Sequence, residues 1–318
     1  MTTFKEIRGT TIEVLSSDPS NPELGQIWYN SSSGTLKGYV FATVNAWASG
    51  GNLNTGRALA AAGGTQTAGI VFGGLETNTP ENYNGTSWTA GAGSINTPRR
   101  YLAGCGTQTA ALAFGGQPPT TGATEKYNGT SWTSVNSMNT ARFSLSGSGT
   151  QTAALAFGGT QYPPISAATE SYNGTNWTSV NSMNTARDQF AGFGTQTAAI
   201  ATGGSSGPGA GVTTTESWNG SSWTTVNSLN TARRGLSGSG LQTAGLAFGG
   251  GVPVSLSATE LWNGTSWTAN PTGLATARRY LMGCGTQAAS LAIGGTPSPT
   301  ATEEWNTTAL QVKTITVS

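Results

Sequence analysis

Apolar residues along this chain fall into short clusters, and no window shows helical periodicity over a useful length. The stretch from Asn139 to Trp177 shows the pattern. A segment of apolar and small residues, Phe143 to Ser148, is followed by the turn residues Gly149-Thr150-Gln151 and then by an almost continuously apolar run, Thr152 to Phe157. Such a run predicts a strand that is buried on both faces.

Two further strands are predicted in the same stretch, at Thr169 to Tyr172 and at Trp177 to Asn181. Between them lies Asn173-Gly174, a strong hairpin signal because both central positions of a type I′ turn require positive φ. A loop of variable length separates this hairpin from the first two strands. The stretch therefore predicts a unit of four short strands that alternate in direction.

Four landmarks of this unit return along the chain in the same order. The first is Asn-Thr-x-Arg (Ala-Thr-Ala-Arg in the last unit), which ends at Arg57, Arg99, Arg142, Arg187, Arg233 and Arg278. The second is a Gly-Gly pair, and the third is Glu-x-aromatic-Asn, which starts at Glu81, Glu125, Glu170, Glu216, Glu260 and Glu303. The fourth is a Trp five residues after that aromatic residue, replaced by Leu310 in the last unit. A period of 42 to 46 residues indicates an array or a propeller.

Four-stranded units repeated in sequence predict the blades of a β-propeller, because packing blades around an axis buries both faces of each sheet and leaves few open edges. The order Arg, Gly-Gly, Glu-x-aromatic and Trp resembles the kelch repeat over roughly residues 50 to 310. This resemblance implies an all-β, kelch-type β-propeller of four-stranded antiparallel blades. It implies no activity, since kelch propellers occur in enzymes and in binding proteins alike.

The N-terminal segment, residues 1–56, bears on the number of blades. It contains candidate strands at Thr11 to Ser16, Gln26 to Asn30 and Leu36 to Val40, and then Trp47. We interpret the segment as a degenerate first blade that also serves as an attachment segment.

With the six units of residues 57–318, this interpretation gives seven blades. Leu310 to Val317 would then be the fourth strand of the last blade. In the alternative there are six blades, the strand of Trp47 completes the last one, and residues 1–42 form a separate anchoring segment.

A second resemblance points to a biological setting. The segment DPSNPELGQIWYNSSSGTLKGYV, followed by NTAR, GTQTA and AFGG repeats, is similar to N-terminal segments of bacteriophage virion and tail-fibre-type proteins, particularly from marine phages. It implies a structural or adhesion protein of a virion, on the tail, a fibre or the capsid surface, present in several copies and made in the host cytoplasm without a signal peptide. The implied partners are other virion proteins and a host-surface glycan.

Composition argues against several classes of function. Charged residues make up 8% of the chain, against about 25% in average proteins, and the formal net charge is +1. Nucleic-acid binding is therefore not expected, and no apolar run predicts membrane insertion. The chain has no His and two Asp, Asp18 and Asp188, so we expect no enzyme, no metal site and no cofactor. Cys105 and Cys284 are expected to be free core thiols.

The repeated polar residues are expected to serve the fold. Each unit supplies one Arg and one Glu, which can form a ring of partly buried ion pairs and hydrogen bonds to loop carbonyls. The Gln of each Gly-Thr-Gln or related turn, such as Gln151, is expected to satisfy backbone groups of that turn. The repeated Trp residues are expected in the core between blades.

The units differ in the loop between the second and third strands and in the pair of residues after the repeated Arg. Because strands alternate in direction, both regions are expected on one face, and the near-identical turns on the other. Loops on a rigid scaffold commonly carry binding sites. The candidate binding residues of this variable face are the unrepeated Arg100, Tyr101, Tyr162, Arg234, Arg279 and Tyr280.

Two other functions remain open at this point. A free carbohydrate-binding lectin would place aromatic residues with polar partners at equivalent positions of several blades, which the variable loops do not show. An intracellular kelch scaffold that binds a peptide would have a strongly charged mouth, for which Arg100, Arg234 and Arg279 are the only indication.

Overall fold

The computed structural model describes residues 12–75, 77–162 and 164–315, which form 26 strands and no helix. The all-β prediction is confirmed, and the described part of the chain contains no helix that could cross a membrane. Three residues assigned to strands from the sequence, Thr11, Thr316 and Val317, lie outside the described ranges. The chain divides into a propeller unit, Ala46–Asn306, and an N-terminal unit, Met1–Asn45 with Thr307–Ser318. The propeller unit thus begins before the expected boundary at residue 56.

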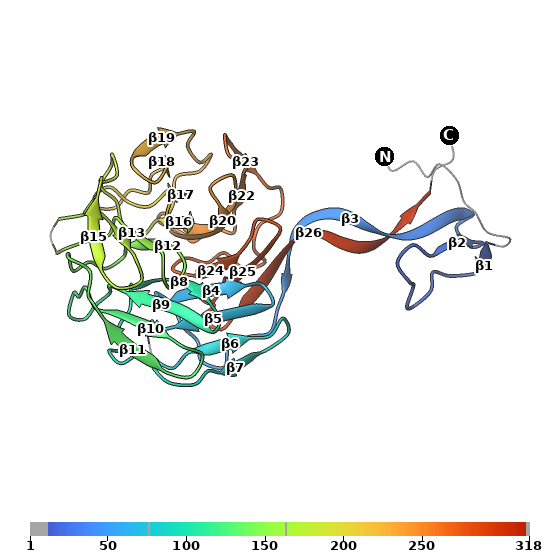
Figure 1. Cartoon of the computed structure of the whole chain (residues 1–318). Helices are drawn as coiled ribbons and strands as arrows, with labels where there is room; N and C mark the ends of the chain where they lie inside the picture. Colours follow the sequence, from blue (N-terminus) through green and yellow to red (C-terminus); the bar gives the residue numbers. More distant parts are fainter. Residues whose placement is uncertain (1–11, 76, 163, 316–318) are drawn as a thin grey trace. The chain divides into compact units, whose positions relative to one another are not determined.

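The propeller unit contains five four-stranded antiparallel sheets whose strands follow one another in the chain (Figure 1). Blade 1 consists of β4 (Ala61–Thr65), β5 (Ala68–Phe72), β6 (Glu81–Tyr83) and β7 (Trp88–Ala90). Blade 2 consists of β8 (Ala103–Thr107), β9 (Ala110–Phe114), β10 (Thr124–Tyr127) and β11 (Trp132–Val135). Blade 3 consists of β12 (Ser146–Gly149), β13 (Ala154–Phe157), β14 (Thr169–Tyr172) and β15 (Trp177–Val180).

Two more blades follow the same plan. Blade 4 consists of β16 (Ala191–Gly194), β17 (Ala199–Thr202), β18 (Thr215–Trp218) and β19 (Trp223–Val226). Blade 5 consists of β20 (Arg234–Leu241), β21 (Ala244–Gly251), β22 (Thr259–Trp262) and β23 (Trp267–Ala269). The expected plan of four short antiparallel strands per repeat is confirmed.

The sixth blade draws on both ends of the chain. It consists of β24 (Met282–Gly285), β25 (Ala289–Ile293), the start of β26 (Thr302–Thr314) and the end of β3 (Thr35–Ser49), which are neighbours in this order. The first strands of the blades contact one another in a closed cycle, β4–β8–β12–β16–β20–β24–β4. The described residues therefore form six blades, as in the alternative arrangement, and the expectation of seven is corrected.

The core lies between neighbouring blades and is organised by the Trp of each fourth strand. The Trp177 ring of blade 3 lies 4.9 Å from that of Tyr172 in its own blade and 5.0 Å from that of Phe114 in blade 2. Its Nε1 donates to Thr124 Oγ1 of blade 2 at 3.0 Å. Close approach also depends on Gly147, because a Cβ there would come within 2.4 Å of the Phe114 ring.

Trp47 makes the same set of contacts in the sixth blade. Its ring lies 5.5 Å from Trp305 of that blade and 4.9 Å from Phe248 of blade 5, and its Nε1 donates to Thr259 Oγ1 at 2.9 Å. These contacts give the physical reason for the correction. Trp47 fills the position at which Leu310 stands in the sequence repeat, so its strand belongs to the last blade and not to an additional one.

One of the six Trp residues lacks this hydrogen bond, and the chain explains why. Five Trp Nε1 groups donate to a Thr that precedes the Glu of the previous blade. The Nε1 of Trp132 is buried without a partner, and the corresponding residue is Pro80, which has no hydroxyl. A buried donor left unpaired costs stability.

We expect Pro80→Thr to stabilise the protein by about 0.5–1.5 kcal/mol, because the new hydroxyl can accept the Trp132 N–H. Urea unfolding of the full chain measures the change. The matched control is Pro80→Val, which has the shape of Thr without its hydroxyl. Equal stability of the Thr and Val variants would contradict the prediction.

The hairpin of the third and fourth strands is confirmed, but its turn is not of the expected type. Tyr172 pairs with Trp177, which leaves the four-residue loop 173–176. Within that loop only Gly174 has positive φ, at 91°. The Asn173 side chain instead accepts two backbone N–H groups of the loop, at 3.0 and 2.8 Å. The predicted two-residue type I′ turn is wrong, because the Asn closes a longer loop through its own side chain.

The N-terminal unit contains the predicted hairpin. Ile27 to Asn30 pair antiparallel with Thr35 to Gly38. Its polar centre is the Asp18 carboxylate, which accepts hydrogen bonds from Lys37 (2.9 Å), Asn30 (2.8 Å) and Trp28 (3.1 Å). The hydrogen bonds from Lys37 and Asn30 lower the pKa of Asp18. The first strand of this hairpin, β2 (Ile27–Asn30), also pairs in parallel with β1 (Glu13–Leu15).

Candidate functional site

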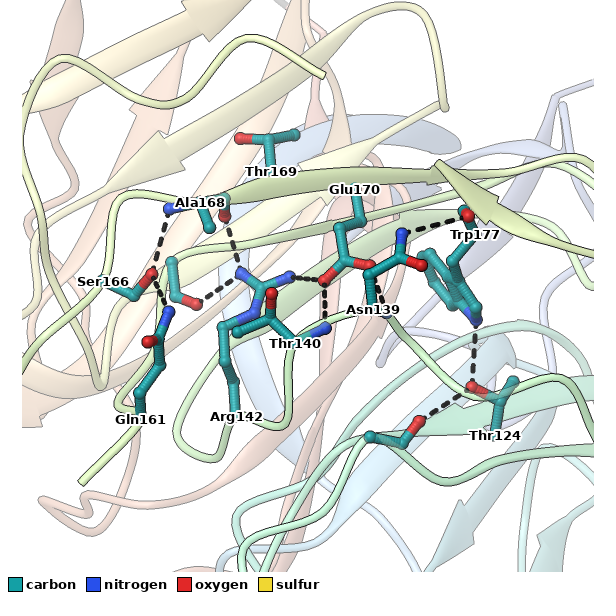
Figure 2. A network of polar contacts seen from close by, with 12 residues as sticks. Thr124, Asn139, Thr140, Arg142, Gln161, Ser166, Ala168, Thr169, Glu170 and Trp177 are labelled. Atoms are coloured by element: carbon teal, nitrogen blue, oxygen red, sulfur yellow. Dashed lines mark hydrogen bonds and ion pairs between the residues drawn. The ribbon is translucent and has the colours of Figure 1, made fainter. Parts of the chain in front are cut away.

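The repeated Arg and Glu form a buried network inside each blade, which Figure 2 shows for blade 3. Arg142 Nη2 donates to Glu170 at 2.9 Å, and its Nη1 donates to the carbonyls of Gly158 (2.8 Å) and Ala168 (2.6 Å). The second Glu170 oxygen accepts the backbone N–H of Asn139 at 2.7 Å. The pair thus fixes the start of the blade to the loop that precedes its third strand.

All six blades contain this pair, with N···O distances of 2.6–3.0 Å and side chains at most 5% exposed. The pairs are Arg57–Glu81, Arg99–Glu125, Arg142–Glu170, Arg187–Glu216, Arg233–Glu260 and Arg278–Glu303. The terminal nitrogens of each guanidinium donate to groups of the same blade, whereas its Nε is buried without a partner. These twelve residues therefore belong to the scaffold.

The repeated Gln residues join blades to one another. Gln151 of blade 3 donates to the carbonyls of Ala111 (3.0 Å) and Tyr127 (2.5 Å), which both belong to blade 2. Gln66 does the same from blade 1 to blade 6, where it reaches Trp305 O at 2.7 Å. The expectation that these side chains serve their own turns is corrected. They satisfy backbone carbonyls of the two central strands of the preceding blade, which the repeat pattern alone does not place nearby.

The second residue after each repeated Arg belongs to a closed ring of backbone hydrogen bonds around the propeller axis. Each N–H donates to the carbonyl of its counterpart in the preceding blade, at 2.7–3.1 Å. This axial ring consists of Leu59, Tyr101, Ser144, Gln189, Gly235 and Tyr280, and Leu59 donates to Tyr280 to close it.

All six residues of the axial ring have φ between 53° and 62°, and five of them are not glycine. Such a conformation is costly for most L-residues and is often found at functional sites. Here the hydrogen bonds between blades hold it in place. The ring also fixes the blade count, because its six bonds join every blade to the next and the last to the first.

The residues around the axial ring form what we call the mouth: the ring itself, the residue before each ring member, and Tyr162. One side of the mouth is aromatic. The rings of Tyr280 and Tyr101 lie 6.4 Å apart, Tyr101 lies 6.0 Å from Phe143, and Phe143 lies 5.8 Å from Tyr162. Tyr280 also packs against Gly235, where a Cβ would lie 3.0 Å from its ring. A continuous aromatic row results.

The mouth also holds three arginines that are outside the buried pairs. Arg279 lies over the Tyr280 ring, 5.4 Å from its centroid, and donates to the carbonyl of Pro253 at 3.2 Å. Arg100 precedes Tyr101 and pairs through its backbone with Gln117, the first residue of a variable loop. Arg234 holds the same position in blade 5. The variable loops and the variable residue pairs thus meet around the mouth.

The six sequence-predicted candidates therefore all lie at one end of the axis, and their role in binding stays a prediction. Sequence reasoning missed Phe143, Ser144, Asp188 and Gln189 as site residues. Each occupies the same variable pair as the candidates, so its position in the pair that follows the repeated Arg could have identified it as a site residue. Selecting Arg and Tyr by residue type excluded them.

A cavity of about 170 Å³ lies on the axis. It is lined by residues 59–62, 101–104, 144–147, 189–192, 235–238 and 280–283. Ser144 is 7% exposed, and its Oγ has no hydrogen-bond partner. The Gln189 Oε1 and the Nε atoms of Arg100 and Arg234 are likewise buried without partners. The mouth thus combines an aromatic side with buried polar atoms that have no partner within the protein.

Asp188 is the acidic residue of the mouth. It is 9% exposed and accepts a hydrogen bond from Thr160 Oγ1 at 2.9 Å. Burial raises its pKa, against the opposing effects of the Thr160 hydrogen bond and of the Arg234 charge. Ionisation of the Asp188 carboxyl therefore lowers the stability of the folded state.

We expect Asp188→Asn to raise the Tm at pH 7. A folded-state pKa above the ordinary value of 3.8 means that the wild-type chain loses stability as pH rises through that interval. The Asn variant lacks this loss and keeps an acceptor for Thr160. Thermal unfolding of both proteins at several pH values measures the difference in Tm, and this difference should vanish below about pH 3. An unchanged or lower Tm at pH 7 would show that the Arg234 charge offsets burial completely.

The two thiols lie in the core, as expected. Cys105 and Cys284 are free and buried, and burial raises the pKa of both to about 12. In the part of the chain that the structure describes, no three residues among His, Cys, Asp and Glu gather as metal ligands would.

The comparisons with known proteins do not show a family for this chain. Neither the protein-family models nor the curated proteins gave a match. Functional inference for this chain therefore rests on its own repeats, its β-propeller architecture and the mouth.

Proposed function

We propose that this protein is a non-enzymatic structural and adhesion protein of a phage particle, built on a kelch-type propeller, that binds a host-surface glycan through its mouth. The kelch assignment rests on the repeated Arg, Gly-Gly, Glu-x-aromatic and Trp landmarks, which occupy equivalent places in the blades. The phage assignment rests on the resemblance of residues 18–40 to virion proteins.

The mouth carries the binding part of the proposal. The residues that differ between blades are concentrated there, on a scaffold whose repeated Arg and Glu side chains pair with each other inside the blades. An aromatic row with arginines beside it is typical of contact surfaces, because aromatic and Arg side chains dominate binding energies. The small axial cavity and the unpartnered polar atoms provide specific hydrogen-bonding positions.

The chemistry of the mouth favours binding over catalysis. Its one carboxylate, Asp188, accepts a hydrogen bond from Thr160. Hydrolysis of a glycosidic bond commonly uses two carboxylates on opposite sides of the bond. The repeated Glu residues are held by Arg inside the blades, so they are not available for that role.

Attachment to the particle is assigned to the N-terminal unit. Ile12, Val14, Leu24 and Tyr29 are exposed apolar side chains of that unit, between 39% and 65% exposed. A neighbouring virion protein could cover them. The propeller unit has fewer such side chains relative to its size, with Tyr162, Leu241 and Val254 as its large exposed ones among the described residues.

The test is mass spectrometry of purified phage particles from the source of the sequence, with antibody labelling by electron microscopy. Label at fixed positions on the particle is the expected result. Absence from particles, with the protein found free in the lysate, would contradict the proposal. It would favour a free carbohydrate-binding lectin, for which the aromatic and polar sides of the mouth provide the argument.

A further inference from the structure

We infer that the mouth recognises a carboxylated saccharide: the aromatic row packs against the sugar, and the mouth arginines bind the carboxylate. This inference rests on the proposed function and names the class of its ligand. It is drawn from the charges, the unpartnered atoms and the saturated backbone of the mouth.

The cations of the propeller unit that lie outside the buried Arg–Glu pairs are concentrated at the mouth. Outside the six buried pairs, residues 46–306 contain four cations: Arg100, Lys126, Arg234 and Arg279. Three of the four lie at the mouth. Lys126 lies in β10, where it donates to Gly174 O at 2.6 Å.

The carboxylates outside the buried pairs do not neutralise the three arginines of the mouth. Asp188 is its described carboxylate, Glu304 accepts a hydrogen bond from the Tyr83 hydroxyl, and Glu76 lies outside the described residues. Arg binds carboxylates well because its planar guanidinium can donate two parallel hydrogen bonds.

The unpartnered atoms indicate that the mouth is built to hold a polar ligand. Ser144 Oγ and Gln189 Oε1 are buried without partners, and both residues line the axial cavity. They lie on the side of the ring that continues from the aromatic row. A sugar has an apolar face and a hydroxylated edge, so one ring can contact the aromatic row and these polar atoms together.

The cavity limits how the ligand enters. At about 170 Å³ it is smaller than the pockets that enclose whole ligands, which measure roughly 300–1,000 Å³. A hydroxymethyl group fits such a space, whereas a complete sugar ring remains outside. The described residues that line the cavity include no arginine, so the carboxylate is expected outside it, beside Arg100 and Arg234. The ligand is therefore expected to lie across the mouth with one substituent on the axis.

The backbone of the mouth argues against an extended peptide. Peptides often bind by adding a strand to free backbone groups of a sheet edge. The six N–H groups and six carbonyls that form the axial ring already bond one another. Recognition at the axis is therefore left to side chains.

Calorimetric titration of the full chain tests the inference. The probes are trigalacturonate, sialyllactose, the methyl ester of each, and a hexaglutamate peptide. We expect at least one acidic saccharide to bind, and its neutral ester to bind about tenfold more weakly. Arg100→Gln and Arg234→Gln should each weaken the acid about tenfold and leave the ester unchanged. Tyr101→Ala should weaken both forms.

The matched control is Lys126→Gln, which changes the net charge equally and should leave the affinity within about twofold. Equal binding of acid and ester, tighter binding of the peptide, or no saccharide binding up to about 10 mM would overturn the inference. The particle experiment tests the phage setting and the titration tests the ligand class, so either proposal can fail without the other. A labelled particle with no saccharide binding rejects the ligand class alone, and binding without a particle location rejects the phage setting alone.

Discussion

Replacing Arg142 by Met is expected to destabilise the propeller by about 3–5 kcal/mol, because it leaves the Glu170 carboxylate buried without its cation. The two groups are at most 1% exposed and 2.9 Å apart. Arg142 also satisfies two loop carbonyls, of Gly158 and Ala168, which the variant leaves without this donor. Urea unfolding of the full chain gives the change in the free energy of unfolding.

Two controls separate the ion pair from the loss of a large side chain. Arg100→Met removes a guanidinium that is outside the pairs, and it should cost less than about 1 kcal/mol. The double variant Arg142→Met/Glu170→Gln should be more stable than Arg142→Met, because it no longer buries an unpaired charge. A double variant as unstable as the sum of both single changes would contradict the ion-pair explanation.

The second large effect is expected from Trp47→Ala, at about 2–4 kcal/mol, because Trp47 is partly buried and makes the contacts of a core Trp. Trp47 connects the end of β3 to blade 5 through Thr259 and Phe248 and packs on Trp305. Its loss weakens the closure of the propeller in addition to leaving a cavity. Hydrogen exchange is expected to rise first in β24 and β25, the strands of the blade that β3 completes.

Trp28→Ala is the comparison for this variant. Trp28 is fully buried in the N-terminal unit and donates to Asp18. It removes the same side chain from a different unit, so the exchange rates of β24 and β25 should remain unchanged. Unaltered exchange in those strands in the Trp47 variant would show that β3 does not close the propeller.

The sequence was sufficient for the four-stranded plan of the repeated unit and for the ion pairing of its repeated Arg and Glu. Arg142 and Glu170 return in every unit at a constant place, so an ion pair between these repeated residues followed from the pattern. The pattern did not show that each pair lies within one blade. The blade number did not follow, because it depends on a contact between Trp47 and Thr259, 212 residues apart. The repeat leaves Leu310 in the position that Trp47 fills, and spacing along the chain does not reveal this substitution.

The candidate site was predicted in position and only partly in composition. The pair after each Arg identified the mouth, and Arg100, Tyr101 and Tyr280 lie there. Phe143 and Asp188 occupy the same variable pair and were missed because the candidates were chosen among Arg and Tyr by residue type. The axial ring itself was not foreseen, since positive φ at Tyr101 or Ser144 has no signature in residue type.

The axial ring has a consequence for how this protein can change. Its geometry uses main-chain atoms, so the frame survives replacement of any side chain that tolerates positive φ. None of its six members is β-branched, which agrees with the strain such residues would meet there. The ring therefore provides six positions at which the side chain can change, and positive φ limits the choice of residue there. Asn, Asp and Gly tolerate this conformation best. New specificity could arise there by single codon changes, without inserting or lengthening a loop.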